Sequence, residues 1–135
     1  MYFLTEGDEM AAKSQLPRPT ESELEILRVL WERGPSTVRV VHESLDRETG
    51  YTTVLKLMQI MAEKGLVDRD ESERSHVYRA REKPEKTQRQ LVGDLMQRAF
   101  GGSAEQLILQ ALSAKKLSAE ELKEIRKLID EQDPR

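Results

Sequence analysis

Polar side chains at helical spacing offer the clearest binding chemistry in this sequence. Within "YTTVLKLMQIMAEK", residues 51–64, one side of a helical wheel holds Thr52, Lys56, Gln59 and Glu63, with Thr53 and Ile60 on its flank. Threonine and glutamine can hydrogen-bond to base edges in a DNA major groove, and lysine can reach a phosphate or a guanine. We therefore predict that this face reads DNA. The alternative is an ordinary solvated helix face.

The elements that must position this face are two earlier helices and a later hairpin. A capping box of Thr20 and Glu23 predicts the start of the first helix, "TESELEILRVLWER", and Gly34 predicts its end. A second, shorter helix is predicted over "TVRVVHESL". The opposite side of the third helix is apolar and is expected in the core, at Val54, Leu57, Met58 and Met61.

A strand pattern follows the third helix directly. After Gly65, "LVDRD" and "HVYRA" alternate apolar and polar residues, and the polar "ESERS" joins them, which predicts a hairpin. Three helices and a hairpin over residues 17–82 are the layout of a winged helix-turn-helix. The basic residues of the wing favour contact with the DNA backbone, whereas its acidic residues favour a solvated face; they are Arg69, Arg74, His76, Arg79 and Arg81, against Asp68, Asp70, Glu71 and Glu73.

Residues 83–135 are predicted to form a separate three-helix dimerisation module. Pro84 and a run of charges break the preceding pattern, and the helical segments beyond carry more apolar surface than so short a module can bury alone. The overall fold class is therefore mainly α (α+β). The predicted dimerisation residues are Leu91, Leu95, Met96, Phe100, Leu107, Ile108, Leu109, Leu112, Leu122 and Ile125.

The composition narrows the classes of function. There is no Cys, and the two His, His42 and His76, lie far apart, so neither a metal site nor a cofactor is expected. No nucleophile lies near either histidine and no Gly-rich phosphate loop is present, so an enzyme is not expected. The net charge of −3 does not decide against DNA, because only the local clustering of basic side chains matters.

The chain is also expected to be cytoplasmic. No apolar run is long enough for membrane insertion, and the N-terminal residues lack the pattern of a signal peptide. Residues 1–16 show no sustained period and are expected to be a flexible leader, with either Met1 or Met10 as the true start.

Four motifs in order resemble those of the penicillinase and methicillin-resistance repressor family. They are "TESELEILRVLWERGPSTVRVVHESL", "YTTVLKLMQIMAEKGLVDR", "HVYRA" and "FGGSAEQLI", and the resemblance extends from Pro17 to near the end of the chain. It implies a homodimeric repressor with an N-terminal winged helix, which binds double-stranded DNA at a palindromic, inverted-repeat operator. Copper-responsive relatives carry Cys clusters, which this chain lacks, so a metal-sensing branch is not expected.

The resemblance also implies particular site residues. The family's base-reading and backbone-contacting positions fall on Thr52, Thr53, Leu55 and Lys56, and a basic position later in that helix is Ile60 here. The operator sequence therefore cannot be transferred. The full predicted DNA-contact set is Thr37, Arg39, Tyr51, Thr52, Thr53, Leu55, Lys56, Gln59, Arg74, His76 and Tyr78.

In the antibiotic-resistance members of that family, proteolysis in the second helix of the dimerisation module relieves repression. The corresponding bond lies near Gln110 and Ala111, and the partner would be a membrane sensor-protease. The alternative is that Gln110 is simply a polar residue of a buried helix. For the whole chain, the alternative to a repressor is a winged-helix protein-interaction module that does not bind DNA.

Overall fold

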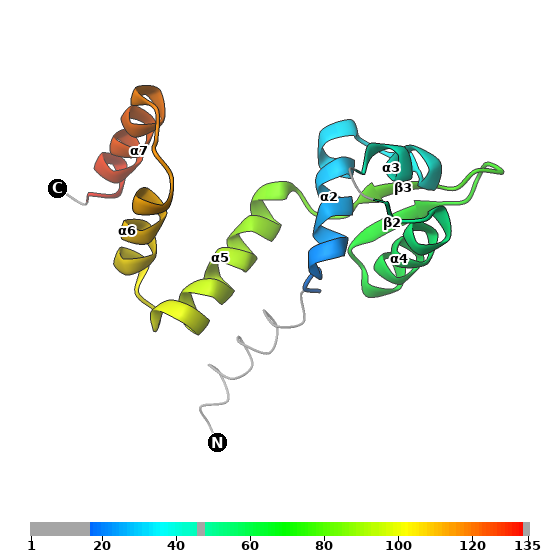
Figure 1. Cartoon of the computed structure of the whole chain (residues 1–135), viewed down its shortest axis with the longest axis horizontal. Coiled ribbons are helices and arrows are strands. Elements are labelled where there is room, and N and C mark those ends of the chain that lie inside the picture. The colour runs from blue at the N-terminus through cyan, green and yellow to red at the C-terminus, as the bar shows by residue number, and fades with distance from the viewer. Residues whose placement is uncertain (1–16, 46–47, 134–135) are drawn as a thin grey trace, which may run out of the picture. The chain divides into compact units, whose positions relative to one another are not determined.

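The computed structural model describes residues 17–45 and 48–133, so the predicted leader lies outside the described residues. The chain divides into two compact units, residues 1–87 and 88–135, and each is described by itself. The elements are α2 (Glu21–Arg33), β1 (Ser36–Thr37), α3 (Val38–Ser44), α4 (Tyr51–Lys64), β2 (Val67–Asp70), β3 (Val77–Ala80), α5 (Pro84–Phe100), α6 (Ala104–Ala114) and α7 (Ala119–Gln132). The predicted fold class is confirmed: helices dominate, with one small sheet (Figure 1).

The predicted capping box starts α2. The Thr20 hydroxyl accepts a hydrogen bond from the Glu23 amide, and the Glu23 carboxylate accepts one from the Thr20 amide, so two exposed helix donors are satisfied together. The helix ends at Gly34, whose φ of 86° suits a residue without a side chain.

The core of the first unit lies between its helices and the sheet. One stripe of α4, formed by Val54, Met58 and Met61, has no solvent exposure, and Leu57 beside it is partly buried. This stripe packs against apolar side chains of α2, α3 and the wing strands; the other core residues are Ile26, Leu27, Leu30, Val38, Val41, Leu66, Val67 and Tyr78. The opposite face of α4 is therefore turned away from the core.

The sheet has three antiparallel strands in the order β1-β3-β2. The predicted hairpin is confirmed as β2 and β3, with Val67 opposite Ala80, and its tip projects beyond the helices in Figure 1. The sequence did not predict β1, which pairs Ser36 with Tyr78. A strand of two residues is too short to show any alternation.

The second unit consists of helices that pack little against one another. Helix α5 ends at a Gly101–Gly102 pair with positive φ angles, and the Gly102 amide donates to the Met96 carbonyl. Ser103 caps α6, and a capping box of Ser118 and Glu121 starts α7. Among residues 88–133, all of which the structure describes, no side chain is buried.

Candidate nucleic-acid interface

The polar face of α4 is exposed along its first two turns. Thr52, Thr53, Lys56 and Gln59 are all exposed, as a face that contacts a ligand must be. Leu55 is only partly exposed and packs against the core, so only part of its side chain could reach DNA.

The start of α4 is held by a histidine of α3. His42 Nε2 lies 2.8 Å from the Thr49 carbonyl oxygen, and its ring meets that of Tyr51 edge-on, with centroids 5.9 Å apart. Gly50, the N-cap of α4, offers no side-chain hydrogen bond. Without a capping side chain at Gly50, the first amides of α4 could donate to an anion such as a DNA phosphate. Tyr51 itself is 48% exposed.

The predicted contacts from α3 have partners within the protein. The Thr37 hydroxyl caps α3 by accepting a hydrogen bond from the Val40 amide at 3.3 Å. Arg39 is exposed, and its guanidinium lies 3.8 Å from the Glu43 carboxylate one turn along. An exposed pair at this spacing is weak, so Arg39 can exchange Glu43 for a phosphate at little cost.

Most wing arginines are paired with acids. Two nitrogens of Arg81 donate to Asp68 Oδ1 at 2.9 and 2.7 Å, and Arg79 lies 3.7 Å from the same carboxylate. Arg69 lies 3.5 Å from Glu71. Among the wing arginines, all of which the structure describes, Arg74 makes no ion pair.

The predicted contacts at the tip of the wing are Arg74 and His76. Arg74 is exposed, and His76 is partly exposed with Nε2 4.0 Å from Glu71. Asp70 accepts a hydrogen bond from the Ser72 amide at 2.9 Å, a turn that shapes the tip. Both basic residues therefore stand where the tip could meet a phosphate backbone.

The prediction that Tyr78 contacts DNA is wrong. Its side chain is 1% exposed and belongs to the core, so it cannot reach a ligand on the surface. A hydrogen bond between the Arg69 and Tyr78 side chains, together with the nearby Glu71 carboxylate, raises the pKa of Arg69. Tyr78 thus supports the wing from inside the fold.

The predicted dimerisation residues are exposed or half-exposed within one chain. Leu95 and Leu109 are 51% and 53% exposed. The proposed cleavage residues Gln110 and Ala111 are exposed on α6. The predicted set omitted Leu128 and Ile129, each 57% exposed on α7, although they continue the helical spacing of Leu122 and Ile125.

The described part of the chain contains neither a metal-binding cluster nor a membrane-spanning helix. Residues 17–45 and 48–133 contain no group of three acidic or histidine side chains placed to hold a metal ion. Within the same ranges, no helix is long and apolar enough to cross a membrane.

Comparisons with known proteins agree with the motif resemblance. The family model described as penicillinase repressor matches residues 19–131. Curated relatives named transcriptional regulator BlaI, from the CDC 1551 / Oshkosh and ATCC 25618 / H37Rv strains of Mycobacterium tuberculosis, are each 40% identical over 68 residues. These residues are 48% of this chain and 49% of each relative, so the chain spans about half the length of the curated relatives it matches.

Proposed function

The chain belongs to the penicillinase repressor family, and from that premise we propose that it is a homodimeric transcriptional repressor that binds an inverted-repeat operator through α4. The observation that carries the proposal is the exposed face of Thr52, Thr53, Lys56 and Gln59 at the start of the third helix of a winged helix-turn-helix. The relatives named transcriptional regulator support the same class of function.

Residues 17–82 form the DNA-binding domain in this proposal. The first turns of α4 enter the major groove, where threonine and glutamine meet base edges and Lys56 meets a guanine or a phosphate. Arg39, Tyr51 and the wing residues Arg74 and His76 contact the backbone and fix the register of the protein on DNA.

Residues 83–135 form the dimerisation domain. Between residues 88 and 133 no side chain is buried, and several leucines and isoleucines are exposed. This segment therefore lacks a core of its own. A second copy would supply that core. Two winged helices joined in this way match two half-sites of a palindrome.

Proteolysis near Gln110 and Ala111 ends repression in this proposal. Both residues are exposed on α6, the helix that carries Ile108, Leu109 and Leu112. Cutting this helix would remove part of the shared core, and each winged helix would lose the advantage of binding two linked half-sites. The protein would act in the cytoplasm, with a membrane sensor-protease as the partner that cuts it.

One observation favours a second candidate, a protein-interaction module without DNA binding. Three wing arginines form ion pairs with acidic residues of the same wing; they are Arg69, Arg79 and Arg81. These ion pairs reduce the positive charge available to bind phosphate. The polar face of α4 argues for DNA, because it joins base-reading and phosphate-reading side chains on one surface.

The deciding experiment is selection of DNA from a random-sequence library by the full chain. A repressor of this kind should enrich an inverted repeat and bind it far more tightly than random duplex, with an affinity that falls as salt rises. Enrichment of no sequence, with equally weak binding at low and high salt, would leave the interaction module as the better function.

A further inference from the structure

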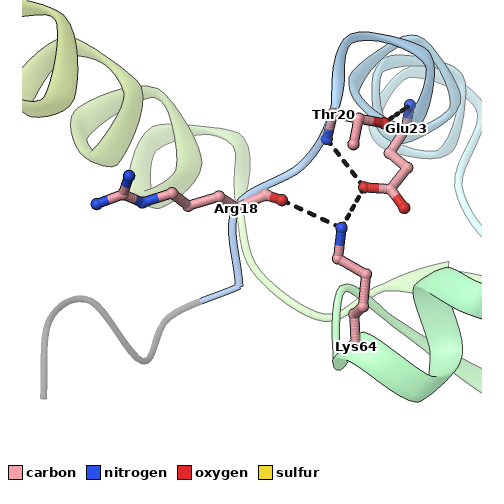
Figure 2. Close-up of polar contacts among 4 residues, drawn as sticks. All are labelled: Arg18, Thr20, Glu23 and Lys64. Atoms are coloured by element: carbon pink, nitrogen blue, oxygen red, sulfur yellow. Dashed lines mark hydrogen bonds and ion pairs between the residues drawn. The ribbon is translucent and has the colours of Figure 1, made fainter. Parts of the chain in front are cut away.

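A polar cluster ties the beginning of α2 to the end of α4, as Figure 2 shows. Glu23 Oε1 accepts a hydrogen bond from the Thr20 amide at 2.9 Å and lies 2.6 Å from Lys64 Nζ. The same ammonium donates to the Arg18 carbonyl oxygen at 3.3 Å. Lys64 is the last residue of α4, and Glu23 lies in the first turn of α2.

The burial of Glu23 makes this contact a strong constraint. Its side chain is 3% exposed, whereas that of Lys64 is 33% exposed. A buried carboxylate is costly without partners, and among the described residues its partners are the Thr20 amide and the Lys64 ammonium. The end of α4 therefore cannot move away from α2 without leaving a charge buried and unpaired.

The far end of α4 is held by different contacts. There His42 of α3 reaches Thr49 and Tyr51, just before the reading face. With the His42 contacts as the pivot, a tilt of about 5° moves Gln59, which lies roughly 10 Å along the helix from Thr52, by about 0.9 Å. Such a displacement exceeds the distance range over which a hydrogen bond forms.

We propose that Glu23 is a positioning residue for sequence reading: through Lys64 it fixes the tilt of α4, so that Thr52, Lys56 and Gln59 meet the base edges. Glu23 does not touch DNA, because its side chain is buried. This inference rests on the proposed function and adds to it a residue that contacts the opposite end of α4 from Thr52.

The test compares Glu23→Gln with a matched control, Glu21→Gln. The glutamine side chain can still accept a hydrogen bond from the Thr20 amide. It has no negative charge, so the ion pair with Lys64 is lost. Glu21 carries the same charge in the same turn of α2 but is exposed. The probes are a duplex selected from a random library by the unmodified chain and an unselected duplex of equal length, with affinities referred to the active fraction of each preparation.

Glu23→Gln should weaken binding to the selected duplex about tenfold, the effect of losing one base contact. Binding to the unselected duplex should change less than about twofold, since phosphate contacts tolerate a small tilt. The control should change neither affinity. A loss of folded protein alone would not alter the ratio of the two affinities, so an unchanged ratio in Glu23→Gln overturns the proposal.

Variants at Lys64 give an independent test that holds even if Glu23→Gln does not fold. Lys64→Arg keeps the ion pair and should keep the ratio, whereas Lys64→Met should lower the ratio as Glu23→Gln does. The double variant should be no worse than either single one, because both remove the same contact. If Lys64→Met lowered the affinity for both duplexes equally and Glu23→Gln lowered neither, Lys64 would be a phosphate contact. That result would overturn the proposal. If the unmodified chain selects no duplex at all, the proposed function itself fails.

Discussion

At the level of single residues, Lys56 is the basic side chain best placed to act on DNA. It is exposed on α4 between Thr52 and Gln59, and no acid of the described part of the chain is paired with it. Replacing Lys56 with Ala should reduce the dependence of log affinity on log salt by about 1 if it meets a phosphate. If it meets a guanine, the change should relax specificity at one base pair by about 1–3 kcal/mol. Fluorescence anisotropy across a salt series separates these outcomes, and no change at any salt would count against α4 as the reading helix.

Gly65 controls how closely the wing follows the reading helix. Its φ of 86° and ψ of 16° are left-handed, and an added Cβ would lie 2.8 Å from Arg81 Nη1. The other two nitrogens of this guanidinium, Nε and Nη2, donate to Asp68 and hold it in place. Gly65→Ala should lower the free energy of unfolding by about 1–2 kcal/mol, as measured by denaturant titration. Gly50 is the control, because its φ is −70° and no atom lies within 4 Å of an added Cβ. An equal effect of both substitutions would contradict this explanation.

Residue burial in helices could be predicted from the sequence, whereas residue burial in the wing could not. Val54, Met58 and Met61 follow from the helical period alone. In "VYRA" the two-residue period leaves open whether Val77 or Tyr78 faces inward. That choice is made by β1 and α2, which pack on β3 from distant parts of the sequence. Because β1 has no sequence signal, the burial of Tyr78 does not follow from the sequence.

At the level of elements, the wing is expected to contribute affinity without sequence specificity. Replacing residues 71–76 with Asn-Gly would keep β2 and β3 joined by a tight turn while removing Arg74 and His76. Binding to the selected and the random duplex should then weaken by similar factors, because in the proposed complex the wing contacts only the backbone. Competition assays with both duplexes measure this. A loss confined to the selected duplex would mean that the wing reads bases.

Helix α7 should lose stability in acid through its capping box. Hydrogen bonds from Ser118, with a smaller contribution from Lys115, lower the pKa of Glu121 below its usual 4.5. Because the folded state has the lower pKa, this stabilisation is complete above pH 4.5 and disappears as the pH falls through the lowered value. Carbon-detected NMR titration should place Glu121 below 4.5, and Glu121→Gln should remove this part of the pH dependence. A titration at the ordinary value would show that the cap does not form in solution.

The ends of the helices could be predicted because they depend on contacts a few residues apart. The box at Thr20 and the helix end at Gly34 are confirmed for this reason. The link between Glu23 and Lys64 joins residues 41 positions apart and has no local signal. A capping glutamate gives no indication in the sequence that it also holds the end of another helix.

At the level of the whole molecule, the proposed dimer would bury the exposed apolar side chains of the second unit. Leu95 on α5 and Leu109 on α6 are about half exposed in one chain. Changing both to Asp should give a monomer in sedimentation velocity, since each carboxylate would cost several kcal/mol inside a shared core. Gln97→Asp, on the opposite side of α5, should remain dimeric. A monomer for the unmodified chain would contradict the dimer directly.

The same pair of substitutions should separate half-site recognition from operator affinity. In a dimer, binding of one winged helix raises the local concentration of the other at the second half-site, so the full operator is bound about 10²–10⁴ times more tightly than a single half-site. The Leu95→Asp, Leu109→Asp variant should lose this advantage on the full palindrome. Its affinity for an isolated half-site should match that of the unmodified chain, because residues 17–82 are unchanged. If the variant also lost half-site binding, the second unit would do more than join two winged helices. If the monomer kept full operator affinity, one winged helix would be sufficient.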